Sequence, residues 1–136
     1  MVLSMIEFYS DQELLKYVEQ EITTTRNNIK VHTEKAEEQR RKYTNLKGKY
    51  NEELLKGVNI EQRKVSGFKV LMNPTVEYEL YIHESIVASL QEKLEALERT
   101  KSMAKFMHAE GVEKVVMIVD DGKPIGFMVY KKRQQQ

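Results

Sequence analysis

Apolar residues recur every seven positions along the first third of the chain, and this spacing predicts a long helix. The repeat comprises Leu15, Ile22, Ile29, Ala36, Tyr43 and Tyr50. Three residues after each of these comes a more polar series, comprising Val18, Thr25, His32, Gln39, Leu46 and Glu53. Alternating steps of three and four place both series on one stripe of a helix. We therefore expect a helix over residues 10–56 whose stripe needs a partner helix.

The ends of this helix have sequence signals of their own. Ser10 is followed three residues later by Glu13, a pair that can satisfy free amides of the first helical turn. Gly57 can adopt the left-handed backbone conformation that ends many helices. Residues 1–9, which precede the helix, are short and apolar, so they predict a strand, with an extra helical turn as the alternative.

A second helix is predicted over residues 75–110, because Pro74 precedes a new apolar stripe with steps of three and four. The stripe comprises Leu80, His83, Val87, Leu90, Leu94, Leu97, Lys101 and Ala104. The simplest arrangement is an antiparallel coiled-coil hairpin within the chain. If the chain reverses near residue 66, His32 lies opposite about residue 99 and does not meet His83. A parallel dimer of the first helices is the alternative.

The end of the chain, residues 114–131, predicts a β-hairpin around Asp121-Gly122. If these two residues form a type I′ turn, Val119 faces Pro124 across the hairpin. The next expected pairs are Ile118 with Ile125, Met117 with Gly126, Val116 with Phe127, and Val115 with Met128. One face then carries Val115, Met117, Val119 and Met128, and the other carries Val116, Ile118, Ile125, Phe127 and Val129. Both faces are apolar, so both should be covered.

The second helix can cover one face of this hairpin through Ala104 and Met107. We expect a protein partner or a second copy of the chain, most simply in a dimer, on the other face. Its candidate partner-binding residues are Val116, Ile118, Ile125, Phe127 and Val129. The alternative is that the N-terminal segment wraps across this face and closes a monomeric core. If residues 1–9 form a strand, they can instead join the hairpin as a third strand.

Together these elements predict one domain over residues 1–136, of the α+β class and mainly α. A long antiparallel two-helix hairpin would carry a small antiparallel sheet at one end. Residues 57–74 form the connection between the helices, with a strand candidate at 65–72, and residues 132–136 form a basic, polar tail. Charged residues make up 32% of the chain, which is typical of long exposed helices.

Composition narrows the functional classes. The formal net charge is only +1, so the whole chain has no strong field for nucleic acid. The chain contains no cysteine, which excludes disulfides, thiol catalysis and cysteine zinc sites. The longest apolar run, Val115 to Val119, is far shorter than a membrane span, and the N-terminus lacks the pattern of a signal peptide. We therefore expect a soluble, cytoplasmic protein without membrane association.

The sequence also lacks a recognisable catalytic or cofactor-binding pattern. His32 and His83 fall on the helical stripes, where a polar residue usually sets the register of packing. His108 has only Glu110 and Glu113 near it in sequence, too few ligands for an ordinary metal site. Turn formation accounts for the acidic pair before Gly122. We expect no enzyme activity, no cofactor and no metal.

One segment is locally basic. Between Gln39 and Asn73 there are nine Lys and Arg residues and three Glu, a net charge of +6. The candidate phosphate-binding residues are Arg40, Arg41, Lys42, Lys47, Lys49, Arg63, Lys64 and Lys69. A basic segment interleaved with aromatic residues can bind nucleic acid, although a solvated helix face is the simpler interpretation.

These observations favour a non-enzymatic coiled-coil protein–protein interaction module, which docks through its apolar sheet and helical stripe. Adaptors, assembly factors and small regulators, including accessory or viral ones, belong to this class. A nucleic-acid-binding protein that uses the basic segment is the alternative. A structural subunit of a larger assembly is a third option and differs from the first in stoichiometry.

Overall fold

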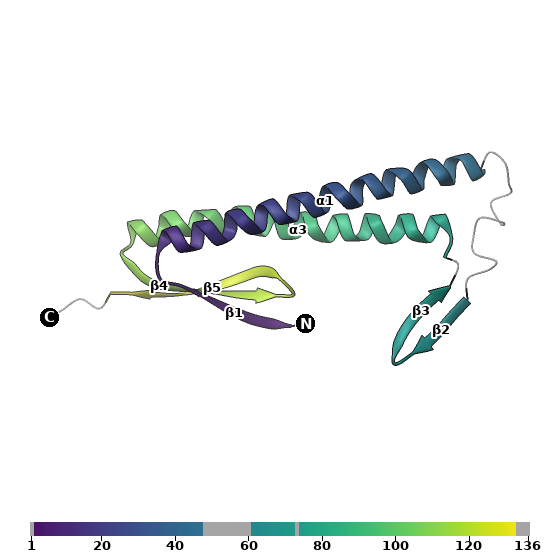
Figure 1. Cartoon of the computed structure of the whole chain (residues 1–136). Helices are drawn as coiled ribbons and strands as arrows, with labels where there is room; N and C mark the ends of the chain where they lie inside the picture. The colour runs from purple at the N-terminus through teal and green to yellow at the C-terminus, as the bar shows by residue number, and fades with distance from the viewer. Residues whose placement is uncertain (1, 48–60, 73, 133–136) are drawn as a thin grey trace. The chain divides into compact units, whose positions relative to one another are not determined.

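The computed structural model describes residues 2–47, 61–72 and 74–132 (Figure 1). Within these ranges the elements follow in the order β1 (Leu3–Phe8), α1 (Asp11–Lys47), β2 (Glu61–Val65), β3 (Phe68–Met72), α3 (Val76–Ala109), β4 (Val112–Asp120) and β5 (Lys123–Lys131). The predicted class is confirmed, because two long helices dominate and a small antiparallel sheet accompanies them. The predicted extension of the first helix to residue 56 lies outside the described residues.

The chain divides into two compact units. Unit 1 comprises Met1–Asn28 and Ser89–Gln136, and unit 2 comprises Ile29–Ala88. Both helices therefore contribute to both units. The sheet of β1, β4 and β5 belongs to unit 1, and the β2–β3 pair belongs to unit 2. That the two units act as one folding domain stays a prediction.

The sheet of unit 1 has the strand order β1-β4-β5, with both pairs antiparallel. The N-terminal strand predicted over residues 1–9 is thus present, and it pairs with β4 from Leu3 opposite Asp120 to Phe8 opposite Val115. The Val2 amide donates to the Asp121 carboxylate at 3.0 Å, which holds the start of β1 at the β4–β5 turn. Because β1 extends the sheet sideways, it does not wrap across a face of the hairpin.

The β4–β5 turn has the predicted geometry, but the pairing beyond it differs. Asp121 and Gly122 have φ angles of 48° and 83°, the two positive values that a type I′ turn requires, and Val119 faces Pro124 as predicted. Ile125 is then an extra residue, a β-bulge, because Ile118 pairs with Gly126. The expected pair of Ile118 with Ile125 is therefore wrong, and so are the three pairs predicted after it.

The bulge has a packing consequence. A shift of one residue moves every following side chain to the other face of the sheet. Phe127 consequently pairs with Met117 and Val129 with Val115, rather than lying on the face of Val116. Phe127 packs against the buried core, so the sequence-based face that joined it to Ile118 is wrong. The gain is the partial burial of an aromatic ring that the regular hairpin would have left on the uncovered face.

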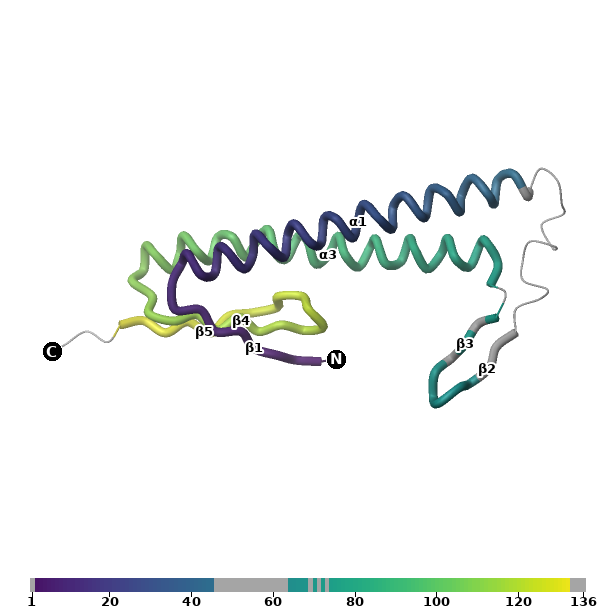
Figure 2. Tube along the Cα trace, viewed as in Figure 1, coloured from purple at the N-terminus to yellow at the C-terminus, as the bar shows by residue number. Residues whose placement is uncertain are grey.

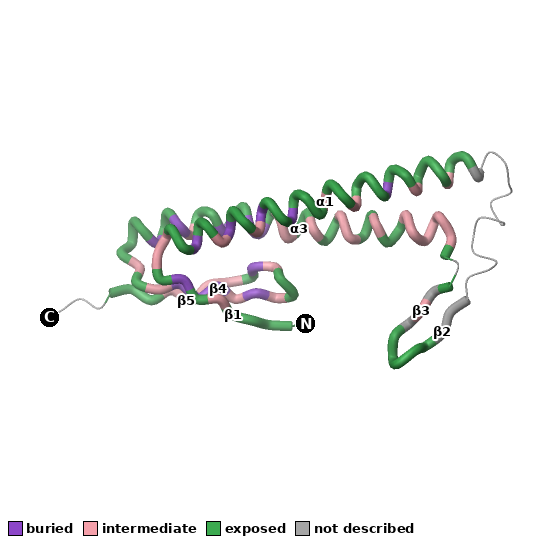
Figure 3. The backbone as a smooth tube through the Cα atoms, viewed as in Figure 1, coloured by how far each residue is buried: buried purple, intermediate pink, exposed green. Residues whose placement is uncertain are grey.

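The core of unit 1 lies between the sheet and the two helices (Figure 3). Its buried cluster comprises Phe8, Leu14, Val18, Ile22, Leu97, Met117 and Val119. Ala104 and Met107 of α3 are also buried, as expected for the helix that covers the sheet. Ser10 caps α1, since its hydroxyl accepts from the Glu13 amide at 3.0 Å and the Glu13 carboxylate accepts from the Tyr9 amide at 3.3 Å.

The burial of α1 confirms most of its predicted stripe. Among the described side chains, the positions that are at least half-buried include Val18, Ile22, Thr25, Ile29, His32, Ala36, Gln39 and Tyr43. Leu15 is an exception at 36% exposed, and its neighbour Leu14 is buried instead, because the first turns of α1 also pack against the sheet. On α3, Lys101 is exposed and Thr100 takes the buried position. Supercoiling of the helices stays a prediction.

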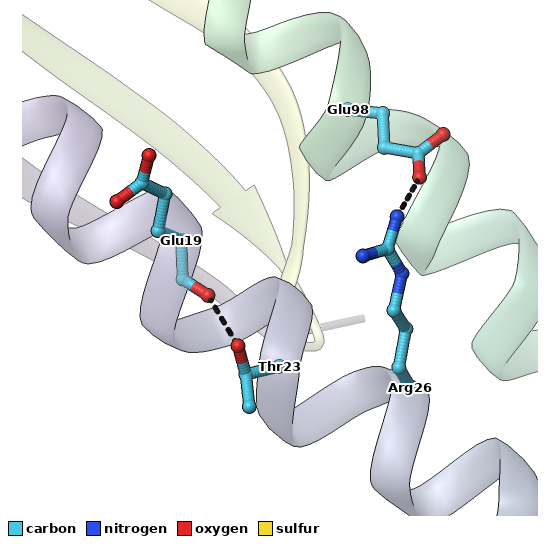
Figure 4. A network of polar contacts seen from close by, with 4 residues as sticks. All are labelled: Glu19, Thr23, Arg26 and Glu98. Carbon is cyan, nitrogen blue, oxygen red and sulfur yellow. Dashed lines mark hydrogen bonds and ion pairs between the residues drawn. The ribbon is translucent and has the colours of Figure 1, made fainter.

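The helices run antiparallel in unit 1, and exposed ion pairs show their register. Arg26 Nη2 lies 2.9 Å from Glu98 Oε1, and Figure 4 shows the arginine extending from α1 to the carboxylate on α3. His108 Nδ1, near the end of α3, lies 3.7 Å from Asp11 Oδ2, at the start of α1. Later residues of α1 thus meet earlier residues of α3. Such exposed pairs contribute little stability, about 0–1 kcal/mol each, but they fix which side chains are neighbours.

In unit 2 the helices are also antiparallel, with a register that differs from the predicted one. His32 lies opposite His83, with 3.0 Å between their Nδ1 atoms, so the prediction that they do not meet is wrong. It assumed that the helices reverse symmetrically about residue 66. That residue instead lies in the tight turn of a separate β2–β3 hairpin, visible in Figure 2, so it does not mark the midpoint between the helices.

The strand candidate at 65–72 is likewise wrong in form, because it is interrupted at Ser66 and Gly67. These two residues have φ angles of 51° and 81° and join two short strands in a second type I′ turn. The second helix begins close to the predicted position. The Thr75 hydroxyl accepts from the Tyr78 amide at 3.1 Å and caps α3, whose first residue is Val76.

Candidate functional site

The face of the unit 1 sheet that points away from the helices is the strongest candidate for a functional surface. We call it the outer sheet face. Register places Met5 beside Ile118, and Val116 beside Met128, on this side. Its exposed apolar residues, with the bulge residue included, are Leu3 at 59%, Met5 at 66%, Ile125 at 54%, Met128 at 37% and Tyr130 at 44% exposed. These side chains lie on the two edge strands, β1 and β5, on either side of the middle strand β4.

The centre of the outer sheet face is partly covered by its own neighbours. Val116 on the middle strand is buried at 3% exposed, and Ile118 is half-buried. Two opposite charges border this face, since Glu7 of β1 pairs with Val116 in the register and Lys114, near the start of β4, pairs with Tyr130. Lys114 Nζ lies 4.4 Å from the centre of the Tyr130 ring, a cation–π contact. The face is therefore apolar with a mixed-charge border.

The structure redistributes the predicted partner-binding residues. Ile118 and Ile125 remain accessible in the outer region, whereas Val116 is buried in the middle of the sheet. Phe127 and Val129 lie on the opposite face, toward the helices. The sequence reasoning missed Leu3 and Met5 because their strand was not paired with a defined register. It missed Met128 and Tyr130 because the bulge was not recognised.

The basic segment is less free than its charge indicates. In unit 2, Arg40 forms an ion pair with Glu84, and Lys42 Nζ lies 3.4 Å from Glu38 Oε1. Arg41 and Lys64 are exposed. The predicted residue Lys49 lies outside the described residues, as do the side chains of Lys47, Arg63 and Lys69. Two of the four described side chains in the predicted set therefore have acidic partners.

The remaining polar candidates are accounted for by structural contacts. His108 Nδ1 lies 3.7 Å from Asp11 Oδ2, and Glu110 pairs with Lys131 at 3.0 Å, so these residues do not gather around a metal. Within residues 2–47, 61–72 and 74–132, three or more His, Asp or Glu side chains nowhere form a metal-binding group. Asp121 binds the amide of Val2, in agreement with a role in the turn.

A polar recess beside the β4–β5 turn was not anticipated from the sequence. Its volume is about 350 Å³, and its lining is Ser89, Leu90, Glu92, Lys93, Asp120, Asp121 and Lys123. Both lysines have acidic neighbours, since Lys93 contacts Glu21 at 3.5 Å and Lys123 contacts Glu92 at 3.7 Å. These pairs join α3 to α1 and to β5, and they explain the polar lining as part of the packing of unit 1.

Comparison with known proteins gives no family for the chain, because no protein-family model, curated protein or solved structure matches it. In the part of the chain that the structure describes, neither long helix has a stretch apolar enough to cross a membrane. The function is therefore inferred from the geometry of the chain itself.

Proposed function

We propose that this chain is a non-enzymatic protein–protein interaction module that dimerises by docking its outer sheet face on a second copy. The observation that carries the proposal is the exposure of Leu3 and Met5 on β1 and of Met128 on β5, on one face of the same sheet. Burial of a large apolar side chain contributes about 1.5–3 kcal/mol when it is complete. When a partner covers residues that are about half exposed, each can therefore contribute roughly half of that free energy.

A second copy suits this surface for two reasons. The net charge of the chain is only +1, so two copies do not repel each other strongly. A two-fold contact is also self-complementary. When residue i of one copy contacts residue j of the other, residue j of the first copy also contacts residue i of the second. Glu7 and Lys114 border the same face with opposite charges, and a two-fold axis can pair each with the other across the interface.

The test is the mass of the purified chain in solution, measured by analytical ultracentrifugation from about 1 to 100 μM. We expect a dimer, twice the 16.0 kDa chain. The variant Met5→Glu with Met128→Glu should weaken the dimer at least tenfold, because two charges would be buried against apolar surface. Both residues are exposed in one copy, so the fold should persist, as circular dichroism can verify.

The matched control is Val31→Glu, which changes an exposed apolar residue on α1 that is 45% accessible. This variant should dimerise like the unchanged chain. A monomer throughout the concentration range would contradict the proposal. A dimer that survives the Met5 and Met128 changes would place the interface on the helices instead, as in the parallel helical dimer.

Nucleic-acid binding through the basic segment is the competing outcome. The ion pairs of Arg40 and Lys42 weigh against it, since paired side chains are less available to phosphates. Fluorescence anisotropy with labelled DNA at low and moderate salt separates the two functions. Steep loss of binding with salt, together with loss in Arg41→Glu, would favour the nucleic-acid interpretation.

A further inference from the structure

The histidine pair of unit 2 has a geometry that suits a metal ion. His32 on α1 and His83 on α3 are both half-buried, with 3.0 Å between their Nδ1 atoms and 5.2 Å between their ring centres. Neutral imidazole is the commonest metal ligand in proteins, and either ring nitrogen can serve. The contact is a hydrogen bond between the two imidazoles, in which one Nδ1–H donates to the other Nδ1 and either ring can be the donor. When both rings carry the proton on Nε2 instead, both Nδ1 lone pairs are free to bind an ion between the helices.

The distance between the two nitrogens is short enough for both to bind one ion. With metal–nitrogen bonds of about 2.0–2.1 Å, ligands at a right angle lie about 2.8–3.0 Å apart, whereas tetrahedral ligands lie about 3.3–3.4 Å apart. The observed 3.0 Å is a hydrogen-bond distance, and small shifts of either ring reach both geometries, so the choice of metal follows from the general order of affinity. Neighbouring nitrogen ligands at right angles are characteristic of tetragonal Cu²⁺ and Ni²⁺, and tetrahedral geometry of Zn²⁺.

We propose that His32 and His83 form a two-histidine site for Cu²⁺ or Ni²⁺ that clamps α1 to α3 within unit 2. No group of three or more acidic or histidine ligands occurs in the described ranges, so water completes the coordination and the ion exchanges readily. Cu²⁺ binds more tightly than Ni²⁺, following the general order of affinity for nitrogen ligands. The proposal is independent of the outer sheet face, which belongs to unit 1.

The test uses the full chain, with NiCl₂ and CuCl₂ as probes. At a free ion concentration about ten times the dissociation constant, Tm should rise by roughly 3–6 °C, because the ion binds only the folded state. His32→Gln and His83→Gln should each abolish this rise. The matched control is His108→Gln, which removes an exposed histidine that lies outside the pair. It should leave the rise unchanged.

A measurement on the unchanged protein tests the proposal even if a variant fails to fold. Histidine side-chain NMR of the unchanged protein follows the three imidazoles separately during addition of Ni²⁺, which is paramagnetic in a water-completed site. The signals of His32 and His83 should broaden together at the same ion concentration, and that of His108 should broaden later or not at all. Broadening of His108 first, or an equal Tm rise in His32→Gln, would overturn the proposal. Larger stabilisation by Zn²⁺ than by Cu²⁺ would overturn the assignment of the metal.

Discussion

Because of the bulge in β5, we expect opposite effects from truncating two nearby side chains, Ile125 and Phe127. In the structure Phe127 packs against the core, whereas Ile125 is 54% exposed. In a regular hairpin both would lie on one face and be equally accessible. Replacing each with alanine therefore tests the register of the whole sheet.

The magnitudes follow from burial. Truncation of a fully buried phenylalanine to alanine costs about 3–5 kcal/mol. Phe127 is half-buried, so Phe127→Ala should lower the free energy of unfolding by about 1.5–3 kcal/mol. Ile125 has few contacts to lose, so Ile125→Ala should cost about 0.5 kcal/mol or less.

Urea unfolding followed by circular dichroism measures this difference. With a slope of about 2 kcal/mol per molar urea, Phe127→Ala should lower the midpoint by roughly 1 M and Ile125→Ala by less than about 0.3 M. The measurements belong at low micromolar concentration, with a repeat at a second concentration, so that any loss of dimerisation is separated from loss of folding. An Ile125→Ala cost equal to or greater than that of Phe127→Ala would refute the bulged register.

Two further predictions concern the turn and a half-buried tyrosine, Tyr17. Gly122→Ala should lower the free energy of unfolding by about 1 kcal/mol, because a φ of 83° strains any residue with a side chain. The control Gly126→Ala should be nearly neutral in the same urea assay, because its added methyl group would only touch Ile118. Burial in unit 1, with a smaller effect of the Glu21 carboxylate, raises the pKa of Tyr17 above its usual value of about 10. The raised pKa favours the folded state fully below about pH 10, and this contribution is lost as pH rises through the raised value. Tyr17→Phe should therefore reduce the fall of Tm between about pH 9 and 11. The control Tyr81→Phe, at an exposed site, should leave that fall unchanged. Equal Tm curves for the unchanged chain and Tyr17→Phe would contradict the raised pKa of Tyr17.

Local signals in the sequence determined most of the elements. The Ser10 and Glu13 pair marks the start of α1, and Asp121-Gly122 dictates the turn between β4 and β5 because few other residues accept two positive φ angles. The stripe from Val18 to Tyr43 specified which side of α1 is buried. Each of these signals depends on residues that are close together in the sequence, so the sequence alone is enough to predict these elements.

Tertiary structure decided the registers, and with them the candidate sites. Whether Phe127 or Ile125 is exposed depends on a single extra residue, whose cost is offset by packing of Phe127 against the buried cluster of unit 1, which comes from distant segments. His32 meets His83 in the alignment of α1 and α3 within unit 2, and a heptad pattern permits several such alignments. A short-range pattern fixes the orientation of a side chain about its own element, whereas the choice between neighbouring alignments is settled by the combined burial of residues far apart in the chain.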